Sequence, residues 1–472
     1  MDGVNTHDKV MEINNVKGKL YDYQKVGIEF LLNSGGRALL ADSPGVGKTA
    51  QALGYIAHAG HKRSLIVCPA SVKFAWESEI AKWTKLESFV VGPHTDLDDI
   101  PFEVNCVIIN FDILKKFFNE FMKYKWDCLV VDEAHLVKNP TAIRSKMVRT
   151  IARGIPNVIM LTGTPVLSRP VEMYNMLNML DPKTWNSYYS YAVRYCGGKQ
   201  GYWGFEAKGA TNLVELKDRI GKYFLRRTKE EVLPNLPPKN RIEIPIDLPK
   251  EERKQYNLVE SNLVAYLKAY KKEKTNSDIA KSLAGEKLVK LNLLREINTM
   301  GKLSTAIELI DGIIEAGEKV LIFSSFNAPL QELHEHYYDQ SVRIIGSTPI
   351  EERGPMVKRF QEDPVTQIFI GGMQSAGVGI TLTAASNVIF LDLPWNPAHL
   401  EQAENRAHRP GAVYQSLNIY TIISRDSIDV FMKKLLAKKQ DIIDQLVGEG
   451  IEAEEEKALN EYLKELSLKY KK

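Results

Sequence analysis

The sequence predicts an α/β protein with two parallel-sheet lobes and helical insertions between them. Short apolar runs of strand type alternate with helix-compatible stretches in residues 18–180, and the alternation resumes in residues 301–445. This pattern is typical of parallel strands joined by crossover helices, and open α/β sheets bind ligands at the carboxyl ends of such strands. Residues 181–300 lack the alternation and are expected to form helical protrusions and a linker.

Five apolar runs are the strand candidates of the first lobe, and a polar extension of residues 1–17 precedes that lobe. The candidates are Arg37–Ala41, Ser64–Cys68, Cys106–Asn110, Cys128–Val131 and Val158–Leu161. Helix-compatible stretches separate these runs, notably Ser71–Trp83 and Thr141–Arg153.

The middle region changes in character along its length. It begins aromatic and Gly-rich (SYYSYAVRYCGGKQGYWGFEAKG), and five prolines then punctuate the stretch from Pro234 to Pro249. This proline-rich stretch is expected to be the linker. The region ends in Glu251–Met300, which is rich in Lys and Glu and is expected to be helical.

The second lobe has five strand candidates of its own. They are Lys319–Ser324, Ser341–Ile345, Thr366–Ile370, Val388–Asp392 and Ser416–Ile422. The last segment, residues 446–472, carries acids early and lysines late, with Leu459, Tyr462, Leu463 and Leu466 on one face. It is expected to be one amphipathic helix whose charges complement its dipole.

Composition sets limits on the class of protein. The 472 residues are 44% hydrophobic and 26% charged, and the formal net charge is +3, so any nucleic-acid binding would depend on local basic patches. No run of 18 apolar residues occurs and the start is polar, so neither a membrane span nor a secretory signal is expected. The four cysteines lie far apart without a C-x-x-C pair, which favours buried thiols over a structural zinc site.

The stretch ALLADSPGVGKTAQAL has the character of a phosphate-binding loop. An apolar strand, a Gly-rich turn and a helix follow one another, which directs backbone N–H groups at phosphate oxygens. Gly45 and Gly47 allow close backbone approach, Lys48 would reach the β- and γ-phosphates, and the Thr49 hydroxyl would hold Mg²⁺. The general pattern G-x-x-x-x-G-K-[ST] has Gly where this chain has Asp42. The alternative is a Gly-rich turn before an ordinary helix.

A second motif, CLVVDEAH, ends an apolar strand in two carboxylates. ATP hydrolysis needs one acid that supports Mg²⁺, here Asp132, and one that polarises the attacking water, here Glu133. Solvated charges at a strand end are the alternative. A third motif, VIMLTGTP, runs a strand into Thr162, Gly163 and Thr164, which would either bond phosphates or form a turn.

Two arginines lie in the second lobe, in QAENRAHR. Arg406 and Arg409 are three positions apart and therefore share a helix face. A salt-bridged surface helix is the ordinary explanation of such a pair. However, a γ-phosphate site needs a cationic stabiliser, and neither motif of the first lobe supplies an arginine. The pair is therefore predicted to complete the ATP site.

DEAH, LTGTP and QAENRAHR together resemble the SWI/SNF-type DNA translocases of helicase superfamily two. The resemblance is collinear over residues 18–445 and implies that both lobes are RecA-like. That family's phosphate loop typically begins with Asp, as at Asp42, for which an Asx-type bond to loop N–H groups is hypothesised. The stretches LSRPVEMYNML, RYCGGKQ and LRRTKEEVLPNLPPK are most similar to the annealing-helicase subgroup (HepA-related, HARP type).

The resemblance implies a role for further residues. LYDYQKVGIEFL resembles the family's Gln motif, in which Gln24 would read the adenine edge. The implied nucleotide contacts are Gln24, Asp42, Gly45, Val46, Gly47, Lys48, Thr49, Ala50 and Gly379, with Thr49 and Asp132 at the metal. The implied DNA contacts are Ser71, Lys73, Trp76, Asn110, Thr164, Ser325, Gly346, Ser347, Thr381, Trp395 and Asn396.

Two departures from the family pattern bear on these expectations. Ser43-Pro44 replaces the usual Glu and the residue after it, which leaves the turnover rate open, and Ile380-Thr381 stands where Leu-Asn is common. The motor is expected without a zinc finger, nuclease motif or reader domain, and without the subgroup's amino-terminal modules.

The resemblance implies an ATP-driven motor that uses Mg²⁺ and acts on duplex or branched DNA independently of base sequence. Strand annealing and fork remodelling are candidate activities. A strand-separating helicase, or a DNA-binding clamp with weak ATPase, are the alternatives. The motor is expected to act as a monomer. Its expected location is cytoplasmic and nucleoid-associated if the source is prokaryotic or viral, and nuclear if it is eukaryotic.

Overall fold

The computed structural model describes residues 11–445, apart from residues 97, 99, 102, 164–169, 202–203, 208, 273–276 and 374–379, together with residues 462, 465, 466, 468 and 469. Two compact units make up the chain. The first runs to Pro234, and the second contains Asn235–Asp444. This boundary falls inside the predicted middle region, residues 181–300. The part of that region up to Pro234 packs with the first sheet, and the part from Asn235 packs with the second sheet.

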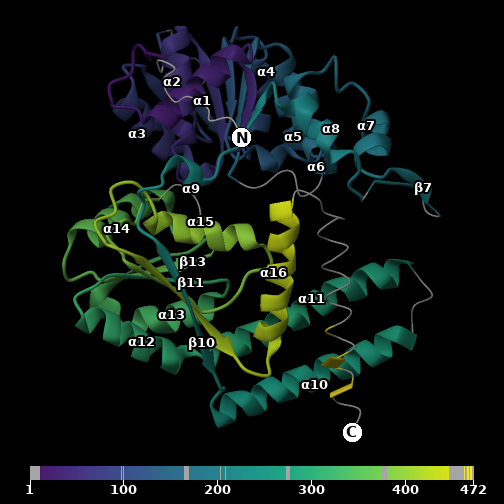
Figure 1. Cartoon of the computed structure of the whole chain (residues 1–472), viewed down its shortest axis with the longest axis vertical. Helices are drawn as coiled ribbons and strands as arrows, with labels where there is room; N and C mark the ends of the chain where they lie inside the picture. The colour runs from purple at the N-terminus through teal and green to yellow at the C-terminus, as the bar shows by residue number, and fades with distance from the viewer. Residues whose placement is uncertain are drawn as a thin grey trace, which may run out of the picture. The chain divides into compact units, whose positions relative to one another are not determined.

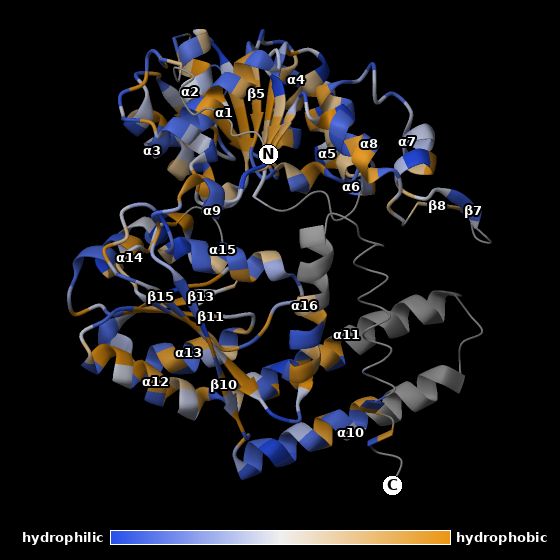
Figure 2. Ribbon diagram, viewed as in Figure 1, coloured by the Kyte–Doolittle hydropathy of each residue, from blue (hydrophilic) through white to orange (hydrophobic). Residues whose placement is uncertain are grey.

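The first unit is built on a parallel sheet in the order β3-β4-β2-β5-β6-β1-β9 (Figure 1). Its strands are β1 (Arg37–Leu40), β2 (Ser64–Cys68), β3 (Ser88–Val90), β4 (Cys106–Asn110), β5 (Cys128–Val131), β6 (Asn157–Leu161) and β9 (Phe224–Leu225). All five predicted strands are present, and their central members are buried throughout, as expected of a parallel sheet covered on both faces. Figure 2 shows this hydrophobic character along the strands around β5.

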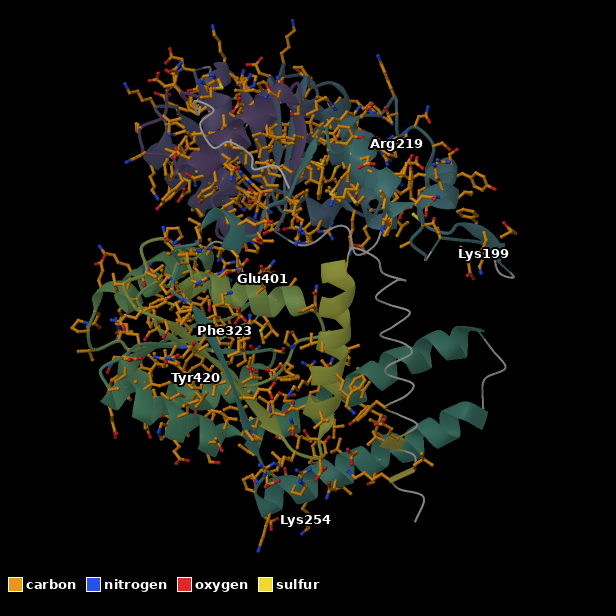
Figure 3. The ribbon with its side chains drawn as sticks, viewed as in Figure 1. Lys199, Arg219, Lys254, Phe323, Glu401 and Tyr420 are labelled. Atoms are coloured by element: carbon orange, nitrogen blue, oxygen red, sulfur yellow. The ribbon has the colours of Figure 1, made fainter. Side chains whose placement is uncertain are left out.

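Helices α1 (Asp22–Asn33), α2 (Lys48–Ala59) and α3 (Lys73–Trp83) pack together, and α4 (Leu114–Phe121), α5 (Ile143–Arg153) and α6 (Pro170–Leu180) form a second group. Figure 1 shows the two groups on opposite sides of the sheet. Beyond α6, the helices α7 (Tyr188–Tyr195) and α8 (Leu213–Ile220) flank an antiparallel pair, β7 (Lys199–Gly201) and β8 (Gly204–Glu206). Arg219 of α8, labelled in Figure 3, lies 4.7 Å from the ring centre of Trp185.

Strand β9 was not predicted, and it matters most for the site. It contains two residues and pairs in parallel with β1, the strand that leads into the phosphate loop. Backbone bonds extend this pairing before and after β9: Leu39 N donates to Tyr223 O (2.8 Å), and Ser43 N donates to Arg227 O (3.0 Å). After its helical protrusion, the chain therefore returns to the edge of the phosphate loop and continues as α9 (Lys229–Val232).

The second unit has its own parallel sheet, in the order β10-β15-β14-β11-β13-β12. Its strands are β10 (Lys239–Ile246), β11 (Val320–Ser324), β12 (Ser341–Ile344), β13 (Ile368–Gly372), β14 (Asn387–Phe390) and β15 (Leu417–Ser424). Residues 239–246 of the predicted linker form the edge strand β10, which was not predicted from the sequence. Pro245 is compatible with that position, since an edge strand leaves one side of its backbone without a partner strand.

Alternate side chains of β11 point to opposite faces of this sheet. Leu321 and Phe323 join a buried cluster with α14 (Ile350–Glu362) and α15 (Pro397–Ala407). Val320 and Ile322 join another cluster with α12 (Leu303–Glu315) and α13 (Asn327–His336). Both faces are thus covered, and the predicted fold class, α/β with two parallel-sheet lobes, is confirmed.

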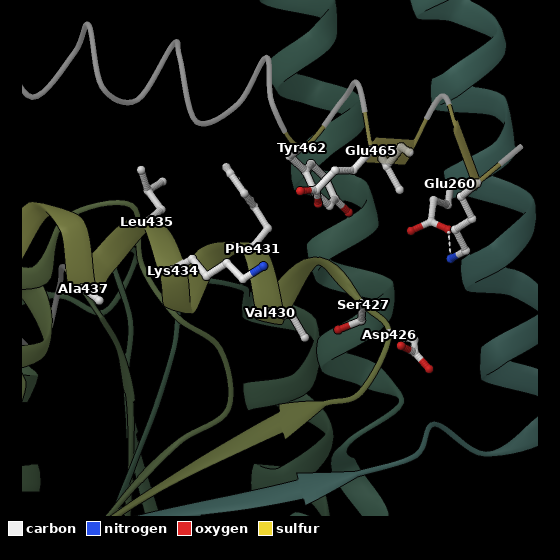
Figure 4. A pocket seen from close by; sticks show the side chains of 12 residues that line it. Glu260, Asp426, Ser427, Val430, Phe431, Lys434, Leu435, Ala437, Tyr462 and Glu465 are labelled. Atoms are coloured by element: carbon white, nitrogen blue, oxygen red, sulfur yellow. Dashed lines mark hydrogen bonds and ion pairs between the residues drawn. The ribbon is translucent and has the colours of Figure 1, made fainter.

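Helices α10 (Lys250–Lys272), α11 (Ser277–Met300) and α16 (Ile428–Gln445) contribute to a third cluster in this unit. Tyr462 and Leu466, two members of the predicted apolar face of the last segment, are buried in it, and Tyr462 stacks on Phe431 at 4.6 Å between ring centres. A cavity of about 710 Å³ opens beside them (Figure 4), where Lys469 pairs with the buried Glu260 at 2.6 Å. Most of the predicted carboxy-terminal helix lies outside the described residues.

No described helix combines the length and the apolar character that a bilayer span requires.

Candidate active site

The phosphate loop lies between β1 and α2, at the carboxyl edge of the first sheet. Gly45 (φ +85°) and Gly47 (φ +80°) are left-handed, a conformation that a side chain would strain, and Gly47 caps the start of α2. A Cβ at Gly47 would lie 2.4 Å from Nε2 of Gln24, so only glycine fits there. The loop N–H groups and the positive end of α2 together form an anion site.

Lys48 is the first residue of α2, and its side chain folds back over the loop. Its Nζ donates to the carbonyl oxygens of Asp42 (2.7 Å) and Ser43 (3.2 Å). Nζ also lies 3.5 Å from where a Cβ of Gly163, in the third motif, would be. The Lys48 ammonium group therefore lies inside the phosphate loop and close to Gly163 of the third motif, VIMLTGTP.

Asp42 differs from the hypothesis made for it. Its carboxylate is fully buried and binds Arg227 instead of loop N–H groups: Oδ1 accepts the Arg227 backbone N–H (2.9 Å), and Oδ2 accepts Nη2 (2.6 Å). Gln51 of α2 donates a further bond to Oδ2 at 3.4 Å. The Asx-type hypothesis is therefore wrong, because a guanidinium 185 residues away balances the charge.

Gln24 is buried beside the loop. Its Oε1 accepts the Tyr21 N–H (3.0 Å), and its Nε2 donates to Val46 O (3.4 Å). The hydroxyl of Tyr23 donates to the same carbonyl (3.1 Å). Gln24 thus lies against the phosphate loop as expected of the Gln motif, and its contact with adenine remains a prediction.

The two carboxylates of DEAH follow β5 at the same edge of the sheet. Asp132 Oδ1 accepts the Glu133 backbone N–H (2.9 Å), and Oδ2 accepts the indole N–H of Trp76 (2.8 Å). Glu133 has a positive φ of 49°, which is strained for a residue with a side chain and is found mostly at functional sites. Its Oε2 pairs with His135 Nδ1 (3.2 Å), and that nitrogen lies 3.4 Å from Thr162 Oγ1 in the third motif.

The chemistry of this pair fits a divalent cation. Burial first, and then the neighbouring Glu133 carboxylate, raise the pKa of Asp132 to about 6. Two acids held together in this way are stabilised by a cation between them. Mg²⁺ needs only one or two protein carboxylates when phosphate oxygens supply other ligands, so the chemistry of Asp132 fits such a site, and the predicted role of the Thr49 hydroxyl stays a prediction. Among the described residues, no group of three His, Cys, Asp or Glu side chains could hold a metal by itself.

The two arginines lie on α15 and after its end, in the second unit. Asn396 caps this helix by accepting the Ala398 N–H (3.0 Å). Arg406 is 6% exposed and donates to Ile380 O (3.2 Å), whereas Arg409 donates to Thr381 Oγ1 (2.7 Å). The burial of Arg406 disfavours the alternative of an ordinary surface helix.

Ion pairs to the buried carboxylate of Glu404 hold α15 against the edge strand β10. Glu404 is 1% exposed and accepts bonds from Lys239 (2.9 Å) and from both terminal nitrogens of Arg241 (2.5 and 2.9 Å). His408 Nε2 is 2.8 Å from Pro237 O. None of these partners was predicted from the sequence, because β10 was taken for a linker.

The DNA contacts predicted in the first unit are only partly compatible with the structure. Ser71 lies in a short 3₁₀ turn, Ala70–Val72, and is partly exposed. Lys73 is 8% exposed with Nζ on Val91 O (3.0 Å), and Trp76 is 2% exposed, so neither presents its side chain to a phosphate. Asn110 is also buried and donates to Asp112 Oδ2 (3.2 Å). Thr164, like the predicted nucleotide contact Gly379, lies outside the described residues.

The DNA contacts predicted in the second unit lie mostly on its surface. Ser325, Gly346, Ser347, Thr381 and Asn396 are exposed, and Trp395 is partly exposed. Beneath them, Arg295 of α11 donates to Asp392 Oδ2 (3.2 Å) and Leu393 O (2.6 Å), and its guanidinium lies 5.2 Å from the Trp395 ring centre. Asp392 Oδ1 in turn accepts the Ser325 N–H (2.8 Å). Arg295, which no sequence pattern singled out, thus supports the segment of Ser325 through Asp392 and the segment of Trp395 directly.

A phosphate loop and a pair of acids on one parallel sheet, with an arginine helix on a second, define a motor-type nucleotide-binding protein. The family model described as SNF2-related domain matches residues 23–295, and that described as Helicase conserved C-terminal domain matches residues 301–411. The chain belongs to the SNF2-related family. The predicted family is confirmed.

Named relatives are about one third identical to this chain over the aligned residues. The mouse (Mus musculus) protein named DNA annealing helicase and endonuclease ZRANB3 is 33% identical over 461 residues, which are 94% of this chain and 42% of that protein. A Caenorhabditis elegans homologue of SWI/SNF-related matrix-associated actin-dependent regulator of chromatin subfamily A-like protein 1 is also 33% identical, over 91% of this chain and 62% of its own length. The chain therefore spans less than two thirds of the length of these relatives.

Among solved structures, the Sulfolobus solfataricus SWI2/SNF2 ATPase core in complex with dsDNA aligns with a TM-score of 0.46 and 25% identity, over 93% of this chain and 95% of that one.

Proposed function

We propose that this chain is an ATP-driven motor that hydrolyses Mg²⁺·ATP when it binds duplex or branched DNA, and that it moves along the DNA without obligatory strand separation. The observation that carries the proposal is the joint occurrence, at one edge of the first sheet, of a phosphate loop that encloses Lys48 and a DEAH pair whose first acid is held by the Trp76 indole and the Glu133 N–H. Membership in the SNF2-related family supports the same conclusion.

Each residue of the site then has a chemical task. Lys48 and the loop N–H groups neutralise the phosphates, and Glu133 orients the attacking water and accepts its proton. Mg²⁺, held by Thr49 and Asp132, would neutralise charge on the β- and γ-phosphate oxygens. Arg406 and Arg409 would stabilise the charge that develops on the γ-phosphate, a role for which an arginine contributes ~10³–10⁵ in rate.

DNA binding is proposed to depend on phosphate contacts and not on base recognition. The candidates are hydroxyl, amide and backbone groups near the carboxyl edges of the two sheets: Ser71 in the first unit, and Ser325, Gly346, Ser347, Thr381 and Asn396 in the second. Binding should be nearly independent of base sequence, because these groups would contact phosphates and not base edges. The steepness with which salt weakens binding should report how many Lys and Arg side chains join them at phosphates.

The proposed substrate is branched duplex DNA on which complementary strands are brought back together. Two relatives carry the name DNA annealing helicase, and the motif stretches quoted above favour the same subgroup. A strand-separating helicase and a clamp with weak ATPase are the competing functions. Monomeric action and, in a eukaryote, a nuclear location belong to the same proposal.

Steady-state ATPase with single-stranded, duplex and forked DNA is the deciding experiment, followed by fork-annealing, fork-unwinding and triplex-displacement assays on the same substrates. We expect the largest stimulation with forked or duplex DNA, together with annealing and triplex displacement. Unwinding of a simple fork would establish the helicase instead, and tight DNA binding without stimulated turnover would establish the clamp.

A further inference from the structure

We infer that Trp76 is a positioning residue for Asp132, which it holds in the orientation needed to support a divalent cation. The inference deepens the proposed function and rests on it. Trp76 belongs to α3, is 2% exposed, and places its indole nitrogen 2.8 Å from Asp132 Oδ2. Its side chain is therefore directed at the catalytic edge of the sheet and not at a DNA surface.

The two oxygens of Asp132 each have a fixed donor. Oδ1 accepts the N–H of the next residue, Glu133, and Oδ2 accepts the Trp76 indole N–H. The first donor is part of the backbone and comes with the strand end, whereas the second comes from another element, 56 residues earlier in the chain. An ionised carboxylate has about four acceptor sites, so two remain for a metal ion or its water after both donors are satisfied.

An indole is well suited to this task. It donates one bond, accepts none, and cannot compete for the cation as a carboxylate, amide or imidazole would. Its large ring is fixed by the surrounding core, so the N–H has a single direction. Groups that orient a metal ligand in this way are the usual supports of metal sites, and their loss costs ~10–100-fold in metal affinity.

The test is Trp76→Phe in the full chain, which keeps an aromatic ring in the core and removes only the N–H and part of the ring area. Nucleotide affinity is measured with ADP in EDTA, and cation affinity is then measured by titrating Mn²⁺ into the ADP complex and following its magnetic resonance signal. We expect ADP affinity in EDTA to stay within about twofold of wild type, and Mn²⁺ affinity to fall ~10-fold.

Trp83→Phe is the matched control, because Trp83 lies on the same helix and its indole N–H also donates to a carboxylate, Glu79 Oε2, at 2.6 Å. That variant should bind Mn²⁺ as wild type does. If Trp76→Phe does not fold, benzothienylalanine at position 76 replaces the N–H by sulfur at nearly unchanged shape and gives the same comparison.

Three results would overturn the inference: unchanged Mn²⁺ affinity in Trp76→Phe, an equal loss in Trp83→Phe, or weaker DNA binding by nucleotide-free Trp76→Phe with normal Mn²⁺ affinity. The last result would restore the DNA contact first predicted for Trp76. Failure of the proposed function is distinguishable, because it would show as absent DNA-stimulated turnover in the wild-type chain, whereas the Mn²⁺ comparison uses neither DNA nor turnover.

Discussion

The ion pair between Arg227 and Asp42 yields the most quantitative prediction. The Asp42 side chain is 0% exposed and that of Arg227 is 15% exposed, and their closest atoms are 2.6 Å apart. The guanidinium also donates to Tyr23 O (2.6 Å) and Gln51 Oε1 (3.0 Å). Arg227→Met would leave the Asp42 carboxylate buried with only a backbone N–H and an amide as donors.

Removing one partner of a buried pair costs about 3–5 kcal/mol, because the other charge remains buried without compensation. For a unit of this size, each kcal/mol lowers the unfolding temperature by roughly 2–4 °C, so Arg227→Met should lower that of the first unit by roughly 6–20 °C. ADP affinity should fall as well, since Asp42 begins the phosphate loop. Arg227→Lys, which keeps the charge but not the forked geometry, should have a smaller effect on both quantities.

Scanning calorimetry and ADP titration measure the two effects. Arg219→Met is the control, because it removes a partly exposed guanidinium from the same unit, and it should change the unfolding temperature much less. In the double variant Asp42→Asn, Arg227→Met both charges are absent, so much of the lost stability should return. An unfolding temperature of Arg227→Met within about 2 °C of wild type, or a double variant no more stable than the single one, would refute the reasoning.

Three further predictions concern Glu133 of the first unit and Arg409 and Glu404 of the second. Glu133→Gln should abolish most DNA-stimulated ATP turnover while ADP affinity is retained, because the amide keeps the shape but cannot accept the proton; normal turnover would exclude Glu133 as the base. Arg409→Ala should lower ATP turnover far more than nucleotide affinity, as measured by ATPase and ADP-binding assays in parallel. A loss of affinity without a loss of turnover would contradict the assignment of Arg409 to the γ-phosphate. Burial alone would raise the pKa of Glu404, but Lys239 and Arg241 hold it below its ordinary value of 4.5. The stability that Glu404 contributes is therefore present above that value and is lost as the pH falls through the lower folded pKa. Thermal unfolding should accordingly find Glu404→Gln less stable than wild type at pH 7, with a difference that shrinks in acid; a constant difference would show that the charge is not responsible.

The local motifs were predictable from the sequence because each is encoded within one strand, one turn and one helix. The glycines of the phosphate loop, the acids after β5 and the arginine spacing all follow from short-range rules. The structure places the loop and the acids at the carboxyl edge of the first sheet, whereas the end of α15 contacts the start of β10 in the second. The five strands of the first lobe were identified for the same reason, since buried parallel strands are continuous apolar runs.

The partners of these motifs were not predictable in this way. Arg227 is 185 residues from Asp42, and Arg295 is 97 residues from Asp392, and neither pair leaves a periodic signal in the sequence. Strand β9 has two residues, too few for any pattern, and the prolines around β10 concealed an edge strand. The inward direction of Lys73 and Trp76 on α3 depends on what packs against the helix, which a resemblance in motif cannot supply.

The stretch between the two units can now be explained from its contacts at each end. In the first unit Arg227 binds the buried carboxylate of Asp42 at the phosphate loop, and in the second Lys239 and Arg241 bind the buried carboxylate of Glu404 on the arginine helix. Arg227 and Lys239 are 12 positions apart in the sequence. A fully extended chain of 12 residues spans at most about 40–43 Å, and α9, which rises only about 1.5 Å per residue, shortens that reach further. This short stretch is thus bonded at each end to a buried carboxylate beside a predicted ATP-site motif. Arg227, Lys239 and Arg241 each have a structural task in their own unit, so the stretch is not a passive linker.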